Sequence, residues 1–233
     1  MGATNHNIDE LLAVDVRHTA GIKIFMGSST GDMLVDDTHV LCEIFKKSKV
    51  LIATHCEDEQ TIKNNLETYK AKYGEEIPFS AHPLIRNEEA CYKSSSMAVQ
   101  LAKKHDTRLH ILHISTEREL QLFGNLLPLE QKRITAEVCV HHLHFTADDY
   151  GTLGNQIKCN PAIKAPNNKE ALQYNLGLES EAKMFSANTG GQTLDYISTS
   201  NATFNNTSFL VIAEQCKSVQ PDDSATKIVV PSK

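Results

Sequence analysis

One lysine and several histidines lie in or directly after short apolar runs of the sequence, where they could build a metal site. Lys23 lies within one run, His55 ends the next, His113 lies on a third, and His141 and His142 follow a fourth. Imidazoles that converge on one rim are typical of metal binding. An unpaired ammonium inside an apolar strand is costly to desolvate, so Lys23 is expected either to take part in chemistry or to reach solvent from a strand edge.

The four apolar runs predict the strands that would position these side chains. They comprise residues 21–26, 50–54, 108–115 and 134–140. Hydrophobic spacing and turn residues predict a helix at residues 8–14 before the first strand, and helices between the strands at residues 38–47, 59–75, 88–104 and 120–129. A loop is predicted after the last strand, over residues 143–158. Strands that alternate with helices indicate parallel βα units, whose functional side chains gather at the C-terminal ends of the strands.

Composition places the chain among ordinary globular proteins. Its 233 residues are enough for one sizeable core, and the net charge of -6 gives no reason to expect nucleic acid or an anionic membrane as a partner. No apolar run is long enough to span a bilayer and the N-terminus carries no signal pattern, so we expect a cytoplasmic protein. The six cysteines form no Cys-x-x-Cys pair and are expected to be free thiols.

Five segments together resemble dihydroorotase, of the amidohydrolase superfamily. They are residues 21–26, 52–58, 109–116, 136–143 and 158–163, and their order and spacing fit that family over roughly residues 1–172. Hydantoinases and allantoinases share the same barrel and metal arrangement. The His-His-Leu segment at 141–143 and the Asn-Pro pair at 160–161 favour dihydroorotase among these relatives.

The resemblance implies a (β/α)8 TIM barrel with a two-metal site that usually holds zinc. Lys23 matches the lysine that is carboxylated and bridges the two metals, which would remove the cost of a buried ammonium. His55 and His113 match the histidines of the second metal, and Asn160 matches a position that contacts the substrate. The implied reaction is the reversible hydrolysis of dihydroorotate to carbamoyl aspartate, a step of pyrimidine biosynthesis.

Three further histidines fall outside the family's ligand positions, and we interpret them as packing or supporting residues: His110, His141 and His142. The family's first strand carries a His-x-His pair for the first metal and an arginine for the substrate carboxylate, and neither occurs here in that context. The family's last strand ends in Asp-His-Ala-Pro-His, whose aspartate is metal ligand and general base, and this sequence is also missing. No catalytic residue is therefore assigned.

These departures predict an incomplete (β/α)8 barrel of about four parallel strands, with ligands for at most one zinc. We expect a dihydroorotase-like hydrolase of a small cyclic amide that is impaired in this chain alone. The alternative is an inactive homologue that acts as a structural or assembly partner, as some dihydroorotase-like chains do beside aspartate transcarbamoylase. Because four parallel strands leave two open sheet edges, a homo-oligomer or a covering partner chain is expected.

Residues 173–233 show no resemblance and form a divergent C-terminal segment. The Ser-, Thr-, Asn- and Gly-rich residues 186–208 predict loops or disorder rather than a packed element. The apolar run 209–213 ends in Glu214, and two interpretations are open for it. It is either a strand or helix that covers exposed surface, or a substitute for the last barrel strand that places Glu214 where the family has its aspartate.

Overall fold

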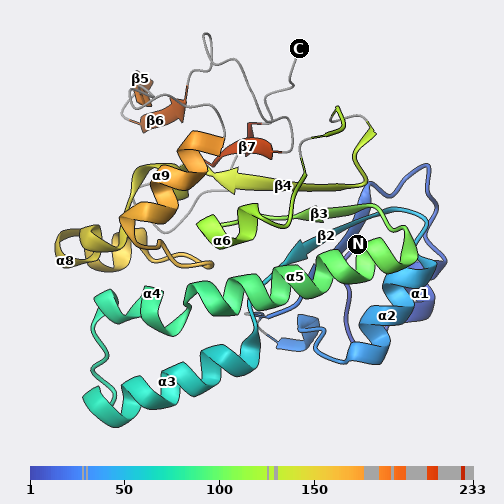
Figure 1. Cartoon of the computed structure of the whole chain (residues 1–233), viewed down its shortest axis with the longest axis horizontal. Coiled ribbons are helices and arrows are strands. Elements are labelled where there is room, and N and C mark those ends of the chain that lie inside the picture. Colours follow the sequence, from blue (N-terminus) through green and yellow to red (C-terminus); the bar gives the residue numbers. More distant parts are fainter. Residues whose placement is uncertain are drawn as a thin grey trace.

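The centre of the fold is a parallel sheet that begins near the N-terminus of the chain. The computed structural model describes residues 1–175 except 28, 30, 125, 129 and 130, and beyond them the backbone of four short strands between residues 184 and 228. Four strands pair in parallel in the order of the sequence (Figure 1). They are β1 (Gly21–Phe25), β2 (Leu51–His55), β3 (Leu109–Ile111) and β4 (Ile134–Cys139).

Helix α1 (Ile8–Leu12) precedes β1, and further helices connect the strands, as expected for βα units. Between β1 and β4 they are α2 (Thr38–Lys47), α3 (Glu59–Tyr73), α4 (His82–Ile85), α5 (Glu88–His105) and α6 (Glu117–Leu120). After β4 come α7 (Val140–His144), α8 (Tyr150–Leu153) and α9 (Pro166–Asn175). The long α5 runs beside the sheet and contacts both α2 and β3 (Figure 1).

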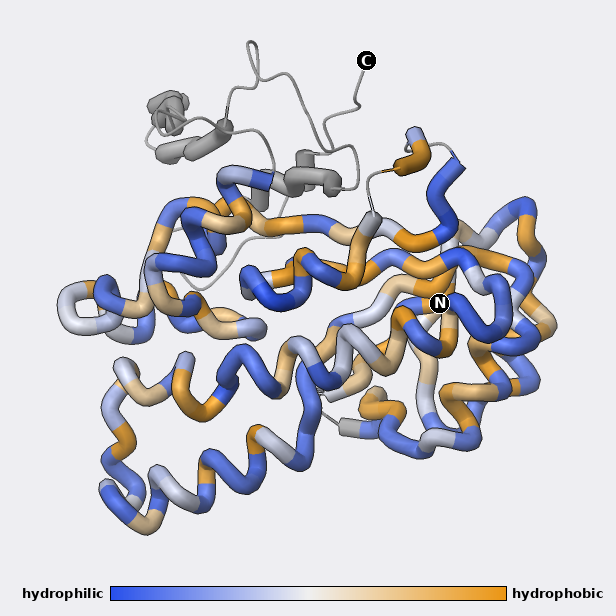
Figure 2. The backbone as a smooth tube through the Cα atoms, viewed as in Figure 1, coloured by the Kyte–Doolittle hydropathy of each residue, from blue (hydrophilic) through white to orange (hydrophobic). Residues whose placement is uncertain are grey.

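The core lies between the sheet and these helices. Apolar stretches follow the central strands and the facing sides of the helices (Figure 2). In β1, Ile22 and Ile24 are fully buried in the core, whereas Lys23 between them points to the other side of the sheet and is half-buried. The strand therefore keeps Lys23 out of the apolar core. No helix of the described part of the chain is long and apolar enough to cross a membrane.

The backbone of the chain itself pairs with both outer strands of the four-stranded sheet. At β1, the Ala3 amide donates to the Lys23 carbonyl and the Lys23 amide donates to the Met1 carbonyl, each at 2.8 Å. At the other edge β7 (Phe209–Glu214) pairs in parallel with β4, and β8 (Lys227–Ile228) pairs antiparallel with β7. The run 209–213 is thus a strand, and the Glu214 side chain lies outside the described residues.

Two predicted elements end or begin elsewhere. The strand predicted over 108–115 is confined to β3, because the chain turns away at His113, whose φ is 40°. The helix predicted over 120–129 is instead α6, which begins earlier because the Thr116 side chain accepts a hydrogen bond from the Glu119 amide. The first difference follows from a backbone turn and the second from a side-chain cap, and hydrophobic spacing reveals neither.

Two predicted loops are also wrong in part. The segment 143–158 contains α8 and two 3-10 turns, and Thr146 and Asp149 form a capping box there. Within 186–208, β5 (Met184–Thr189) and β6 (Gln192–Ile197) pair antiparallel. The backbone register of this pair sets Phe185 opposite Tyr196 and Ala187 opposite Leu194.

Candidate metal-binding site

His55 and His113 face each other at the C-terminal ends of neighbouring parallel strands. The Nδ1 atom of His55 lies 3.2 Å from the Nε2 atom of His113, and the two rings meet edge to face. A tetrahedral zinc ion with Zn–N bonds of about 2.0–2.1 Å would hold two such nitrogens about 3.3 Å apart. The two ring nitrogens therefore have the spacing that a shared metal ion requires.

The backbone positions this pair through the register of the sheet. His55 is the last residue of β2 and pairs with Phe25 of β1. His113 follows β3 by two residues and adopts a left-handed backbone conformation, which is uncommon outside glycine. Such conformations occur disproportionately at functional sites, and here the turn brings the His113 ring back toward His55.

A buried ion pair fixes the orientation of His55. Its Nε2 atom donates to the Glu57 carboxylate at 2.9 Å, and the Arg86 guanidinium donates to the same carboxylate oxygen at 2.6 Å. Burial opposes ionisation of Glu57, but the hydrogen bond from His55 and the charge of Arg86 outweigh it and lower the pKa of Glu57 to about 2. With its proton held on Nε2, His55 presents the Nδ1 lone pair to His113, as metal-ligating histidines do.

The environment keeps His113 neutral, which is the form that binds a metal. Burial, and then the charges of His55 and Lys23, hold the pKa of His113 well below its usual value. Its Nδ1 atom is buried without a hydrogen-bond partner. Lys23 itself lies with Nζ 4.5 Å from the centre of the Phe25 ring. The structure thus brings His55 and His113 together at the ends of β2 and β3, with Lys23 on the neighbouring strand β1.

Other predicted positions have different surroundings. His110 uses both ring nitrogens, with Thr135 Oγ1 at 2.8 Å and Glu137 Oε2 at 2.9 Å, so it supports the sheet. Asn160 is exposed and precedes Pro161 through a cis peptide bond, and its contact with a substrate stays a prediction.

Glu57 and Arg86 were not singled out from the sequence. The signal for Glu57 is its position two residues after His55 in the matching segment 52–58. Arg86 carries no such signal, because it lies beyond α3 and reaches the site only through the fold.

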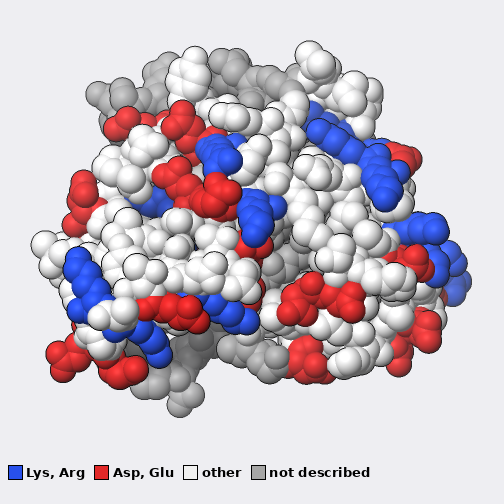
Figure 3. Space-filling view, turned by 60° about the horizontal axis from the view of Figure 1, so that its bottom comes forward, with Lys and Arg blue, Asp and Glu red and all other residues white. Residues whose placement is uncertain are grey.

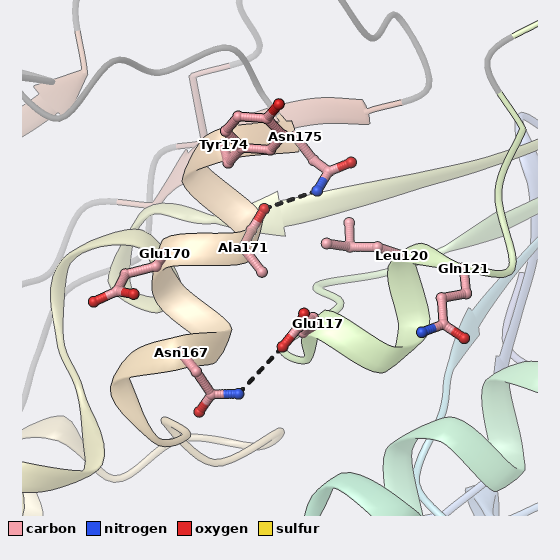
Figure 4. A pocket seen from close by; sticks show the side chains of 8 residues that line it. All are labelled: Glu117, Leu120, Gln121, Asn167, Glu170, Ala171, Tyr174 and Asn175. Carbon is pink, nitrogen blue, oxygen red and sulfur yellow. Dashed lines mark hydrogen bonds between the residues drawn. The ribbon is translucent and has the colours of Figure 1, made fainter.

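A separate groove of about 580 Å³ lies between α6 and α9 (Figure 4). Its lining residues are Glu117, Leu120, Gln121, Asn167, Glu170, Ala171, Tyr174 and Asn175. None of them is a candidate metal ligand, so the groove is not part of this site. On the face of the molecule shown in Figure 3, acidic and basic side chains are interspersed.

No protein-family model matches the chain. It is 30% identical over 179 residues to an allantoinase of Deinococcus radiodurans, and 30% identical over 181 residues to a dihydroorotase of Methanosarcina acetivorans. Each match covers 73% of this chain and 38% of the relative. Over this stretch the chain is homologous to dihydroorotases and allantoinases. It spans little more than a third of the length of these curated relatives.

Solved structures show the same fold. The chain superposes on an L-hydantoinase (dihydropyrimidinase) from Arthrobacter aurescens with a TM-score of 0.66 and 23% identity, over 76% of this chain and 40% of that one. A dihydropyrimidinase from Brevibacillus agri gives a TM-score of 0.63 at 18% identity, over 76% and 39%. The predicted fold class, the parallel strands and helices of an incomplete (β/α)8 barrel, is confirmed.

Proposed function

We propose that this chain is part of a zinc-dependent hydrolase of cyclic amides, with dihydroorotate as its substrate. The observation that supports this most directly is the 3.2 Å separation between Nδ1 of His55 and Nε2 of His113 at the ends of adjacent parallel strands. Homology to dihydroorotases and allantoinases supports the same class of reaction, the opening of a cyclic amide.

In this proposal His55 and His113 hold one zinc ion, and Lys23 supplies a third ligand. The Lys23 ammonium would first lose a proton. The neutral amine would then attack carbon dioxide, forming an N–C bond and releasing a second proton, which leaves a carbamate anion. A bound zinc ion would lower the pKa of a water molecule and polarise the amide carbonyl of the substrate. Glu57 and Arg86 keep the His55 ring in the orientation that this requires.

We also propose that the chain alone is a slow catalyst. Its 233 residues contain no Asp-His-Ala-Pro-His segment, and the His-x-His spacing at His142 and His144 occurs in α7, beyond the four central strands. A second set of ligands and a general base would have to come from elsewhere, and loss of a general base typically costs about 10²–10⁴ in rate.

The test is ring opening of dihydroorotate by the zinc-loaded chain, with allantoin and hydantoin at the same concentration for comparison. We expect slow hydrolysis above the zinc-only background, fastest with dihydroorotate, and loss of that rate in Lys23→Ala. His18→Ala, at an exposed position, is the matched control and should not change the rate. An unchanged rate in Lys23→Ala would contradict the assignment of Lys23. A zinc-loaded chain inert toward all three substrates would instead favour the non-catalytic homologue.

A further inference from the structure

A second group of metal-binding side chains lies at the end of β4. Cys139 is the last residue of this strand and α7 begins at the next one, so a thiol and two imidazoles arise within four residues. One ligand atom from each of Cys139, His141 and His142 lies within 4.8 Å of the others. Cys139 and His142 are buried and His141 is half-buried, so the group is largely shielded from water.

The surroundings of His142 point to a ligand. Its Nε2 atom donates a hydrogen bond to the Pro161 carbonyl at 3.0 Å, which places the ring proton on Nε2. The Nδ1 atom is then an acceptor, and it is buried with no hydrogen-bond partner. A buried polar atom without a partner is normally destabilising. Metal-ligating histidines are commonly held in this way, with one ring nitrogen on a backbone carbonyl and the other on the metal.

The three ligand atoms lie somewhat farther apart than they would around a bound metal ion. Tetrahedral zinc, with bonds of about 2.3 Å to sulfur and about 2.0–2.1 Å to nitrogen, holds a sulfur and a nitrogen about 3.6 Å apart and two nitrogens about 3.3 Å apart. Starting from separations of at most 4.8 Å, the ligand atoms need to close by no more than about 1.5 Å. The pair His55 and His113, by contrast, offers nitrogen ligands alone.

We propose that Cys139, His141 and His142 form a separate mononuclear metal site with a fourth position open to an outside ligand. A thiolate with two imidazoles selects zinc or another thiophilic transition metal over magnesium or calcium. The site is made entirely by residues at the β4–α7 junction and shares no ligand with His55 and His113, so it does not depend on the proposed hydrolase activity.

The test is titration of cobalt(II) into the metal-free full chain, followed by its absorption spectrum. We expect a thiolate-to-cobalt charge-transfer band that saturates at one cobalt per chain, is lost in Cys139→Ser, and is retained in the control Cys42→Ser, which removes a thiol of α2. Retention of the band in His55→Ala would separate this site from the hydrolase site. A wild-type chain without the band, or a band that persists in Cys139→Ser, would overturn the proposal.

A second measurement needs no variant, in case Cys139→Ser does not fold. Zinc-edge X-ray absorption of the unmodified, zinc-loaded chain should show a sulfur scatterer at about 2.3 Å beside nitrogen scatterers at about 2.0–2.1 Å. A shell of nitrogen and oxygen atoms without sulfur would contradict the site even if zinc binds at His55 and His113.

Discussion

Replacement of Arg86 by methionine tests the buried ion pair that orients His55. The Arg86 side chain is 17% exposed and Glu57 is completely buried, and their 2.6 Å contact is shielded from bulk water. Arg86→Met keeps much of the apolar bulk of the side chain but removes the positive charge that offsets the cost of burying the Glu57 carboxylate. Removal of one partner of a buried ion pair typically lowers the free energy of unfolding by about 3–5 kcal/mol. Glu57 keeps its contact with His55, so we expect a loss of about 3 kcal/mol.

The assay is urea-induced unfolding at pH 7, with Arg17→Met as the matched control. Arg17 makes an equally short contact with Asp15, at 2.7 Å, but its side chain is 80% exposed. Solvent screening makes such surface pairs nearly neutral, so we expect little change in the unfolding midpoint of Arg17→Met. We also expect Arg86→Met to weaken zinc binding about 10–100-fold, because His55 loses part of its support. Equal stability of the two variants would refute the reasoning.

Three other predictions follow from local structure. Gly27→Ala should destabilise the chain by about 3 kcal/mol or more in urea unfolding, because the φ of Gly27 is 149° and a Cβ would lie 1.7 Å from the Glu57 carbonyl oxygen. Gly151 has open space around it, so the control Gly151→Ala should be neutral or stabilising. Similar effects of the two substitutions on stability would contradict this prediction. Burial lowers the pKa of His82 in the folded chain, so His82 takes up a proton at higher pH in the unfolded chain than in the folded one. The free energy of unfolding should therefore fall as the pH drops below about 6.5. His82→Gln should flatten this pH dependence, and a pH profile unchanged by the substitution would contradict the prediction. Asp58→Ala removes the side-chain cap of α3 and should cost about 1 kcal/mol in thermal unfolding, whereas an unchanged melting temperature would show that the cap contributes nothing.

The helices and strands with strong local signals could be predicted from the sequence. The predicted helix 38–47 is α2 to the residue, because Asp37 caps it and its apolar positions lie on one face. The helix predicted over 88–104 is α5, extended by one residue. Elements fixed by distant contacts were less predictable. The turn at His113 depends on pairing with the neighbouring strands, which local patterns do not contain.

The same distinction holds for the site. His55 and His113 could be found because each lies at or near the end of an apolar run, and parallel strands bring those ends together. Lys23 could be found because it is a charged residue inside such a run. The contact between Glu57 and Arg86 joins residues 29 positions apart and appears only in the folded chain. From sequence, His141 and His142 are interpreted as packing or supporting residues and Cys139 as a free thiol, because the sequence does not show which nitrogen of His142 is already hydrogen-bonded.

The central claim is that His55 and His113 share a metal ion, and zinc binding to the metal-free full chain tests it most directly. Calorimetric titration should give one zinc fewer per chain in His113→Ala than in the wild type, with His18→Ala as the control. If the Cys139 site also binds, the same difference should persist in a Cys139→Ser background. An unchanged zinc stoichiometry and affinity in His113→Ala would contradict the claim.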